Sequence, residues 1–270
     1  MFSGMTRNHR PIKSWQKFGK HVRSKGCDLL SQLDNFPNSV LVSGCQRSGG
    51  TMLAGILTKS EGMVNFAWSK DDELDAALIL SGIEDHKPQG RYCFQTTYLN
   101  ECYQEYFEVK SSFKLIWLLR NPHSVVYSLI HNWKRFALNE LYLACGMEIT
   151  PKPIVERYNR FGLISVSRLT RACMSYNAKI SQIYEILEKL GPDAVYVVDY
   201  DELVTNKNDF LPDLYDFIDL PYQNKYADAI LSSSLKKADK LSVRERTMVD
   251  ELCMPVYEKL RGLIRYKQSV

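Results

Sequence analysis

The chain has 270 residues, of which 45% are hydrophobic and 24% are charged, and its formal net charge is +4. A chain of this length can bury a full core, and the composition is typical of globular proteins. The mild positive charge suits an anionic small molecule or a polyanionic acceptor, but it falls well short of a nucleic-acid-binding surface. We therefore expect a globular protein without a nucleic-acid partner.

The expected location rests on the apolar segments and on the cysteines. No stretch approaches the ~20 consecutive apolar residues of a transmembrane segment, and no apolar segment follows the basic N-terminus as in a signal peptide. The seven cysteines are scattered and include no CxxC pair. This pattern argues against a disulfide framework and against a zinc site. We therefore expect a cytoplasmic protein that binds no metal.

The segment 1–35 is basic and has no strong apolar pattern. A solvated N-terminal helix or tail is one interpretation, and recruitment of an anionic acceptor or a membrane surface is the other. From position 39 onward, apolar segments alternate with helical patterns. We predict a basic N-terminal extension over 1–35 and a single α/β domain over 36–270.

Short apolar segments that end at turns predict strands over 39–44, 64–68, 91–96, 114–120 and 194–200. Helical patterns predict helices over 70–81, 98–109, 165–190, 209–218 and 242–264, and two more that begin near Thr51 and at Pro122. Strands that are apolar throughout and separated by helices indicate a parallel β-sheet. The predicted fold class is therefore α/β, with helices on both faces of that sheet.

A loop with three glycines, 44–51 (GCQRSGGT), follows the first predicted strand and begins a helix. Backbone N–H groups converge at such a helix N-terminus and form an anion site together with the helix dipole. The spacing is that of the Walker A motif, GxxxxGK[ST], but Gly50 occupies the lysine position. The positive charge lies inside the loop instead, at Arg47, whose guanidinium can bind phosphate or sulfate oxygens in a bidentate manner.

A second candidate anion site lies at the end of the strand 114–120. Arg120 stands at the carboxyl end of this strand, where open α/β sheets bind ligands. Pro122 is suited to begin the next helix, and Ser128 lies eight residues after Arg120 on that helix. An arginine and a hydroxyl placed in this way can hold one phosphate together.

The two motifs together resemble those of the sulfotransferase superfamily that depends on 3′-phosphoadenosine 5′-phosphosulfate (PAPS). The 5′-phosphosulfate loop of that family, [RK]SG[TS]T, is matched by 47–51, and its 3′-phosphate motif is matched by Arg120, Pro122 and Ser128. The segment 194–203 resembles the family's late strand and the turn after it. The resemblance implies a P-loop-NTPase-like sulfotransferase architecture.

The resemblance also implies an activity. It implies transfer of a sulfuryl group from PAPS, without a metal, to a hydroxyl or amine of an unidentified carbohydrate, lipid or small molecule. Arg47 would neutralise charge on the leaving phosphate together with the backbone N–H groups. The implied nucleotide-binding residues are Arg47, Ser48, Gly49, Gly50, Thr51, Met52, Arg120, Ser128, Lys236 and Lys240.

Two departures from the family pattern affect the general base. Gly50 replaces the usual hydroxyl residue, and Gln95-Thr96-Thr97 stands where many relatives have Lys-Thr followed by His or Pro. Carboxylate-dependent relatives place an acid at the start of the helix after the second strand, so the candidates here are Glu73 and Asp71. Acidic residues in a first helical turn also complement the helix dipole without any catalytic role.

His123 and His131 are the remaining candidates for the base, and we expect both on helix surfaces. Two other functions stay open on the sequence alone. A P-loop nucleotide or small-molecule kinase would need the Walker lysine or a Mg²⁺-binding acid, and Gly50 argues against it. A nucleotide-binding relative that has lost the base, and therefore the activity, is supported mainly by Gln95.

Overall fold

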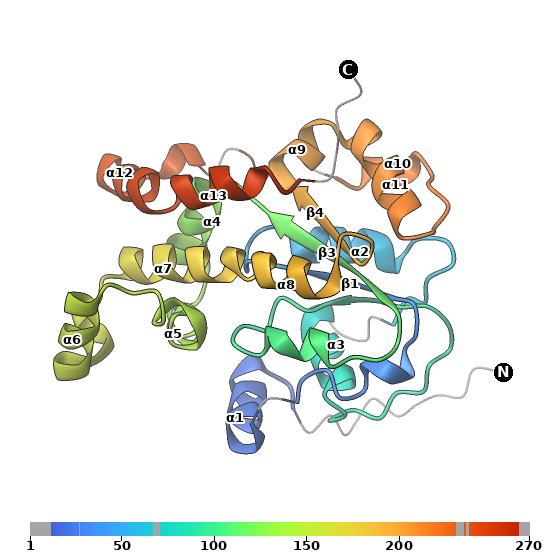
Figure 1. Cartoon of the computed structure of the whole chain (residues 1–270), viewed down its shortest axis with the longest axis horizontal. Coiled ribbons are helices and arrows are strands. Elements are labelled where there is room, and N and C mark those ends of the chain that lie inside the picture. The colour runs from blue at the N-terminus through green and yellow to red at the C-terminus, as the bar shows by residue number, and fades with distance from the viewer. Residues whose placement is uncertain (1–11, 27, 67–70, 231–234, 236–237, 265–270) are drawn as a thin grey trace.

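The computed structural model describes residues 12–26, 28–66, 71–230, 235 and 238–264. A parallel sheet lies at its centre, with strand order β2-β1-β3-β4 (Figure 1). The strands are β1 (Ser39–Gly44), β2 (Cys93–Gln95), β3 (Phe113–Leu119) and β4 (Val195–Asp199). The predicted α/β fold class is therefore confirmed. In this order the carboxyl ends of β1 and β3, which precede the two candidate anion motifs, are neighbours.

Side chains of the central strands alternate between two buried clusters, one on each face of the sheet. In β1, Leu41 belongs to one cluster, whereas Val40 and Val42 belong to the other. In β3, Trp117 belongs to the cluster of Leu41, and Ile116 belongs to the cluster of Val40. This alternation follows from the two-residue period of a strand. Because both faces are covered, the strands are apolar throughout.

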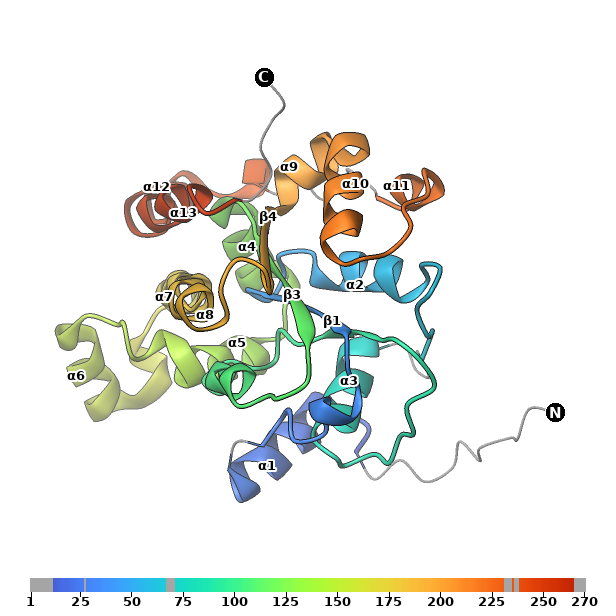
Figure 2. The same ribbon diagram turned by 45° about the vertical axis from the view of Figure 1, so that its right-hand side comes forward.

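Helices cover both faces of the sheet (Figure 2). The face of Val40 is covered by α2 (Gly50–Thr58), α9 (Tyr200–Thr205), α10 (Lys207–Phe217) and α11 (Lys225–Asp228). The cluster of Leu41 is completed by α1 (Trp15–Lys25), α3 (Asp72–Leu80), α4 (Pro122–Tyr127), α5 (Arg135–Leu141), α7 (Arg168–Ser181), α8 (Ile183–Leu190), α12 (Val243–Leu252) and α13 (Met254–Arg261). The helix α6 (Lys152–Phe161) has no buried residue and projects from the body of the molecule.

Four of the predicted elements differ in the structure, and the last of them, the helix 242–264, forms as two helices. The predicted strand 64–68 does not form over 64–66, and only an isolated bridge between Met63 and Arg91 lies next to this segment. Positions 67–68 lie outside the described residues. The helix 98–109 is also wrong, since only the 3-10 turn Tyr103–Phe107 forms there. The helix 165–190 is divided into α7 and α8.

Side chains from α7 and the residue that follows it explain the missing helix at 98–109. Lys179 Nζ donates to the carbonyl of Leu99 at 3.0 Å, and Gln182 Nε2 donates to the carbonyl of Asn100 at 2.7 Å. These carbonyls would be acceptors inside a helix, but here they satisfy polar groups of another element. A tertiary contact therefore overrides the local helical pattern.

The predicted helix 242–264 forms as two helices, α12 and α13. Its start is as expected, because Ser242 and Glu245 form a capping box. The division falls at Cys253, two residues before Pro255 in the first turn of α13. Proline has no backbone N–H and fits the first turn of a helix better than an interior position.

The described part of the segment 1–35 is not a solvated tail. Phe18 of α1 is buried, and so are Leu29, Leu30 and Leu33 after it, all in the cluster that also contains Leu41. The indole Nε1 of Trp15 donates to Asp71 Oδ2 at 2.7 Å. This segment therefore packs against the same core as the sheet, and the boundary at 35 stays a prediction.

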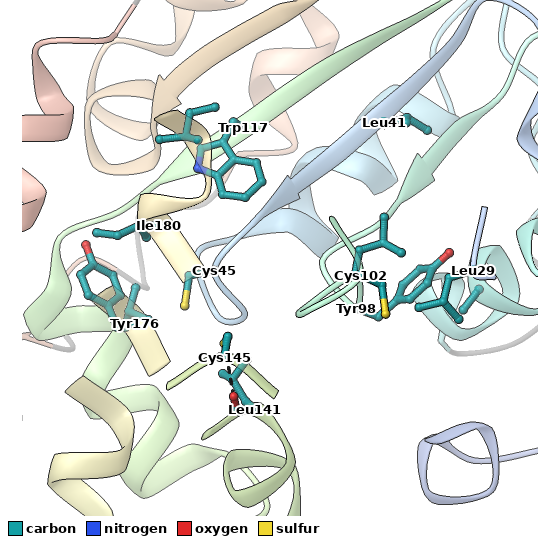
Figure 3. Close-up of a cluster of buried hydrophobic side chains, with 14 of the residues drawn as sticks. Leu29, Leu41, Cys45, Tyr98, Cys102, Trp117, Leu141, Cys145, Tyr176 and Ile180 are labelled. Carbon is teal, nitrogen blue, oxygen red and sulfur yellow. Dashed lines mark hydrogen bonds between the residues drawn. The ribbon is translucent and has the colours of Figure 1, made fainter. Parts of the chain in front are cut away.

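The core beneath the first loop contains several cysteines (Figure 3). Cys45 directly follows β1 and lies with Tyr176 and Cys145 in the same buried cluster. The thiol of Cys145 donates to the carbonyl of Leu141 at 3.2 Å. Burial raises the pKa of the Cys145 thiol to about 12, which keeps it protonated. These side chains pack as small hydrophobic groups and fix where the loop begins.

One cysteine departs from the expectation against a disulfide framework. Cys102 is disulfide-bonded, and the thiols of Cys45, Cys93, Cys145, Cys173 and Cys253 are free. Spacing in the sequence did not indicate this bond, because folding brings distant cysteines together. Disulfides are typical of oxidising compartments, and the cytoplasmic location stays a prediction. None of the described helices has the length and apolar composition needed to cross a membrane.

We predict that thiol titration of the denatured chain will find two more thiols after reduction than before it. One intramolecular disulfide masks two of the seven cysteines. The titration should be done on protein alkylated before purification, so that air oxidation does not add bonds. An equal thiol count with and without reductant would contradict the disulfide.

Candidate functional site

The loop between β1 and α2 needs glycine at two positions for steric reasons. Gly44 has φ = 132°, and a Cβ atom there would lie 2.4 Å from the carbonyl oxygen of Leu118 on β3. Gly49 has φ = 103°, and a Cβ atom there would lie 2.1 Å from the ring of Tyr200. Real Cβ atoms do not approach other atoms so closely, and L side chains disfavour both values of φ. The loop is therefore pressed against β3 and the start of α9.

The loop turns back over the sheet at Arg47, whose φ of 73° lies in the left-handed region. Few residues other than glycine adopt this conformation, and it is found preferentially at functional sites. The guanidinium Nε of Arg47 donates to Ser128 Oγ at 3.0 Å. Partial burial lowers the pKa of Arg47, and so does the neighbouring charge of Arg120. The first loop thus contacts a residue of the second motif directly.

Arg120 connects the two motifs a second time. Its Nη1 donates to the carbonyl oxygen of Arg47 at 3.2 Å, and its side chain is almost fully buried. The guanidinium stacks 4.2 Å from the ring centroid of Tyr200 and lies 3.5 Å from Asp201 Oδ1. The other carboxylate oxygen of Asp201 accepts the backbone N–H of Asn121 at 3.1 Å. A buried guanidinium is therefore oriented by an aromatic face and a carboxylate.

The sequence reasoning missed the roles of Tyr200 and Asp201. Both residues follow β4, whose register beside β3 brings them to Arg120. The available signal was their position at the carboxyl end of an apolar strand, where ligand sites of parallel sheets form. The adjacency of β3 and β4 was needed to connect them with Arg120.

The remaining loop residues surround the N-terminus of α2. Ser48 is 1% exposed, and its Oγ has no hydrogen-bond partner among the described residues. Thr51 is exposed beside it, while Met52 Sδ lies 3.8 Å from the hydroxyl of Tyr200. A buried hydroxyl without a partner is costly unless it meets a ligand or water.

Gly50 and Gln95, the two departures from the family pattern, are spatial neighbours. A Cβ atom on Gly50 would lie 3.2 Å from the amide Nε2 of Gln95, so the glycine leaves room for the longer side chain. The same Nε2 donates to Thr97 Oγ1 at 3.3 Å. The two substitutions are therefore structurally compatible with each other.

Glu73, on the first turn of α3, is the last acceptor in the hydrogen-bond chain from Gln95 through Thr97. Its carboxylate accepts a hydrogen bond from Thr97 Oγ1. Burial raises the pKa of Glu73 to about 7, with opposing contributions from the Thr97 hydrogen bond and the charges of Lys179 and Arg47. Such a carboxyl group can take up a proton near neutral pH.

Asp71, the other predicted carboxylate, is occupied in a different way. Its Oδ1 accepts the backbone N–H of Leu74 at 3.1 Å and caps α3, while its Oδ2 accepts the indole of Trp15. Each oxygen thus has a structural partner. This arrangement fixes the start of the helix that carries Glu73.

Neither histidine faces Glu73. His131 is exposed, as expected, and its Nε2 lies 3.1 Å from Glu245 Oε1. The expectation for His123 is wrong, because this residue is buried, with Nε2 2.7 Å from Asp250 Oδ1 on α12. The packing of α12 against α4 covers it.

The structure says little about the two lysines that were predicted to bind the nucleotide, Lys236 and Lys240. Lys240 is exposed just before α12, and Lys236 lies outside the described residues.

A large cavity begins at the loop and at Glu73. Its volume is about 1920 Å³, and Arg47, Thr51 and Glu73 line it together. One wall comes from α1, with Trp15 and Phe18. Further lining comes from the segment 132–144. The arginine of the first motif and the half-buried carboxyl group of Glu73 therefore share one cavity.

Comparisons with known proteins agree with this architecture. The sulfotransferase domain from the curacin biosynthetic pathway has 14% sequence identity and a TM-score of 0.51, over 86% of this chain and 99% of that domain. Sulfotransferase STF9 from Mycobacterium avium has 11% identity and a TM-score of 0.50, over 92% of this chain and 81% of that protein. These similarities show a shared fold. A comparison with curated proteins finds no match.

The family comparison goes further than the structural similarities. The family model of the sulfotransferase domain matches residues 37–250, which is most of the chain and includes β1, the loop after it, Arg120 and Ser128. The resemblance inferred from the two motifs is thus confirmed, and the chain belongs to the sulfotransferase domain family and is a sulfotransferase.

Proposed function

We propose that PAPS is the sulfuryl donor, with its phosphosulfate on the loop after β1 and its 3′-phosphate between Arg120 and Ser128. The observation that carries this proposal is the direct contact between the motifs, in which Arg47 Nε meets Ser128 Oγ and Arg120 meets the carbonyl of Arg47. One nucleotide that carries a 5′-phosphosulfate and a 3′-phosphate on the same ribose can therefore reach both motifs. Within the loop, the buried hydroxyl of Ser48 has no hydrogen-bond partner among the described residues.

The proposed chemistry is an in-line transfer. An acceptor oxygen or nitrogen attacks the sulfur atom, the bond between sulfur and the bridging phosphate oxygen breaks, and adenosine 3′,5′-bisphosphate (PAP) leaves with the bonding electrons. Negative charge develops on that oxygen. Arg47 and the N–H groups at the start of α2 are placed to stabilise it without reorganising, which is the most effective form of electrostatic catalysis.

The acceptor's proton passes to Glu73 in this proposal. Glu73 lines the same cavity as Arg47, and a pKa of about 7 makes it both a competent base and a group that is largely ionised above neutral pH. Asp71 acts as a positioning residue, because capping α3 and accepting the Trp15 indole occupy its two oxygens.

The other two functions are less well supported. The kinase is disfavoured because this chain has Gly50 at the position of the Walker lysine. Gly50 packs against the side chain of Gln95. A relative without activity was suggested because Gln95 stands where relatives have lysine. Glu73 weakens this alternative, since it lines the cavity and is the proposed candidate for the base that such a relative would lack. In the proposed step Arg47 takes the charge-neutralising role that phosphoryl transfer gives to Mg²⁺.

We predict different effects for the two arginines. Arg47→Ala should lower kcat by about 10²–10³-fold, as expected for the loss of one preorganised donor, with a smaller loss of PAP affinity. Arg120→Ala should weaken PAP binding first. Calorimetric titration with PAP and initial rates with labelled PAPS measure the two effects, and Arg160→Ala on exposed α6 is the control. Wild-type turnover by Arg47→Ala would refute the assigned role.

We predict that kcat rises with pH through a midpoint near 7 in the wild type. Glu73 must be deprotonated to accept a proton, so activity is lost as the pH falls below its pKa of about 7. Glu73→Gln should lower kcat by about 10²–10⁴-fold, the usual contribution of a general base. The matched control is Glu188→Gln, since this residue lies on α8 and does not line the cavity. Unchanged turnover of Glu73→Gln would exclude it as the base.

Thr97→Val should move the acidic limb of this pH profile upward. The Thr97 hydroxyl donates to Glu73 and lowers its pKa, so removing that donor leaves the desolvated carboxyl with a higher pKa. The pH dependence of kcat measures the shift, and Thr205→Val on α9 is the matched control. A lower kcat of Thr97→Val without a shift of the acidic limb would show that Thr97 acts only in holding the structure and does not affect the pKa of Glu73.

A further inference from the structure

Lys179, on the last turn of α7, places an ammonium group in the core. Its side chain is fully buried and does not line the cavity. Nζ donates to the carbonyl of Leu99 at 3.0 Å and lies 5.9 Å from the ring centroid of Trp117. Burial lowers the pKa of Lys179 to about 8, so the group is still mostly charged at pH 7. A buried charge is costly unless it is compensated, so this lysine is an expensive way to fill the core.

The segment 97–100, which accepts this hydrogen bond, joins the loop after β1 to Glu73. Gln46 of that loop donates through Nε2 to the carbonyl of Thr97 at 2.8 Å and to Asn100 Oδ1 at 2.7 Å. From the same segment, Thr97 Oγ1 donates to Glu73. The bond to the ammonium lies between these contacts along the chain. It therefore fixes the piece of backbone that connects the two halves of the site.

The ammonium also acts on Glu73 through its charge. Burial raises the pKa of Glu73 most, and the charge of Asp71 raises it further. The charges of Lys179 and Arg47 oppose them and favour the carboxylate. Tyr98 also lies near Glu73, but burial raises the pKa of its phenol, which stays neutral. Lys179 is thus one of two cations that support the ionised base.

The counter-charges of Lys179 are carboxylates. Burial lowers its pKa, and Cys145, Cys45, Glu101 and Glu73 act in the opposite direction. Burial raises the pKa of both thiols, that of Cys145 to about 12, so neither carries charge near neutral pH. Of the two acids, Glu101 is exposed to solvent, which screens its charge. Glu73 is the one inside the proposed reaction site.

We propose that Lys179 is a positioning residue for the general base. It holds the segment that carries Thr97, and it presents a fixed positive charge to Glu73 from outside the cavity. The inference rests on the proposed function, in which Glu73 takes the acceptor's proton. Lys179 acts only through the segment and the carboxylate. Such support matters because a displacement of about 1 Å at a reacting group can lower a rate by about 10²-fold.

The direct test is the titration of Glu73 in the full chain. Carbon-13 NMR of the glutamate carboxyl groups follows it, with the Glu73 signal assigned from Glu73→Gln. The wild-type midpoint should lie at about 7. Lys179→Met should move it upward by about 0.5 pH unit or more, because the carboxylate loses a nearby positive charge. An unmoved or lower midpoint would overturn the inference.

Two variants separate this effect from a general disturbance of the structure. Gln182→Met removes the neighbouring hydrogen bond to the carbonyl of Asn100 but removes no charge, so the Glu73 midpoint should stay in place. Lys189→Met, which removes an exposed lysine of α8, is the matched control. A shift in Gln182→Met as large as that in Lys179→Met would show an effect of packing alone and would contradict the proposal.

A reciprocal measurement keeps the proposal testable where Lys179→Met does not fold. Coupling between two sites is mutual, so the carboxylate of Glu73 must favour the charged form of Lys179 to the same extent. Glu73→Gln should therefore lower the pKa of Lys179 from its value of about 8, measured by NMR of the lysine side chains. A pKa of Lys179 that is the same in Glu73→Gln and in the wild type would refute the coupling.

Both NMR measurements need no acceptor, which keeps the failures of the two proposals apart. Wild-type turnover of PAPS by Glu73→Gln contradicts the proposed base, whatever the NMR midpoints are. Loss of turnover in Glu73→Gln without coupling between Glu73 and Lys179 contradicts only the role of the lysine.

Discussion

The buried charge of Arg120 is the constraint on which the rest of the site depends. A guanidinium that is almost fully buried must be paired, because desolvating an uncompensated charge costs several kcal/mol. Here the compensation comes from two separate segments, of which one supplies the carbonyl of Arg47 and the other supplies the ring of Tyr200 and the carboxylate of Asp201. The hydroxyl of Tyr176 on α7 also binds the carbonyl of Arg120 at 2.7 Å. Satisfying one side chain thus fixes the loops after β1 and β4 and the start of α4.

This constraint explains which features could be predicted from the sequence. The loop at 44–51 and the motif at Arg120 are local patterns, in which the spacing of residues along a strand, a turn and a helix determines their geometry. The strands β1, β3 and β4 were predicted to within one or two residues because they are continuous apolar segments. Local physical rules are sufficient for such elements.

The features that were missed depend on contacts between distant segments. The helix expected over 98–109 is absent because its carbonyls accept Lys179 and Gln182. The disulfide at Cys102 and the bond between Trp15 and Asp71 likewise join segments far apart in the chain. No spacing rule reports such pairs. Asp71 was therefore ranked with Glu73, although only the folded chain shows that its oxygens are already occupied.

The two departures from the family pattern, Gly50 and Gln95, are explained by their contact in the fold. Gly50 alone removes a hydroxyl and Gln95 alone removes a lysine, and each substitution suggested a weakened enzyme. In the fold, the side chain of Gln95 occupies the space above Gly50 and extends a chain of donors through Thr97 to Glu73. A neutral amide in this place adds no positive charge near Glu73. The pKa of Glu73 therefore stays near 7 instead of being driven far lower, as a lysine so close would do.

The charged groups of the cavity then serve two tasks in the proposed transfer. Arg47 and the N–H groups at the start of α2 provide positive potential for the phosphosulfate of the proposed donor. Glu73 lines the same cavity as Arg47 and is the proposed base. Because burial opposes ionisation of Glu73 more strongly than the charge of Arg47 favours it, the pKa of Glu73 stays at about 7, where the carboxylate can still take up a proton.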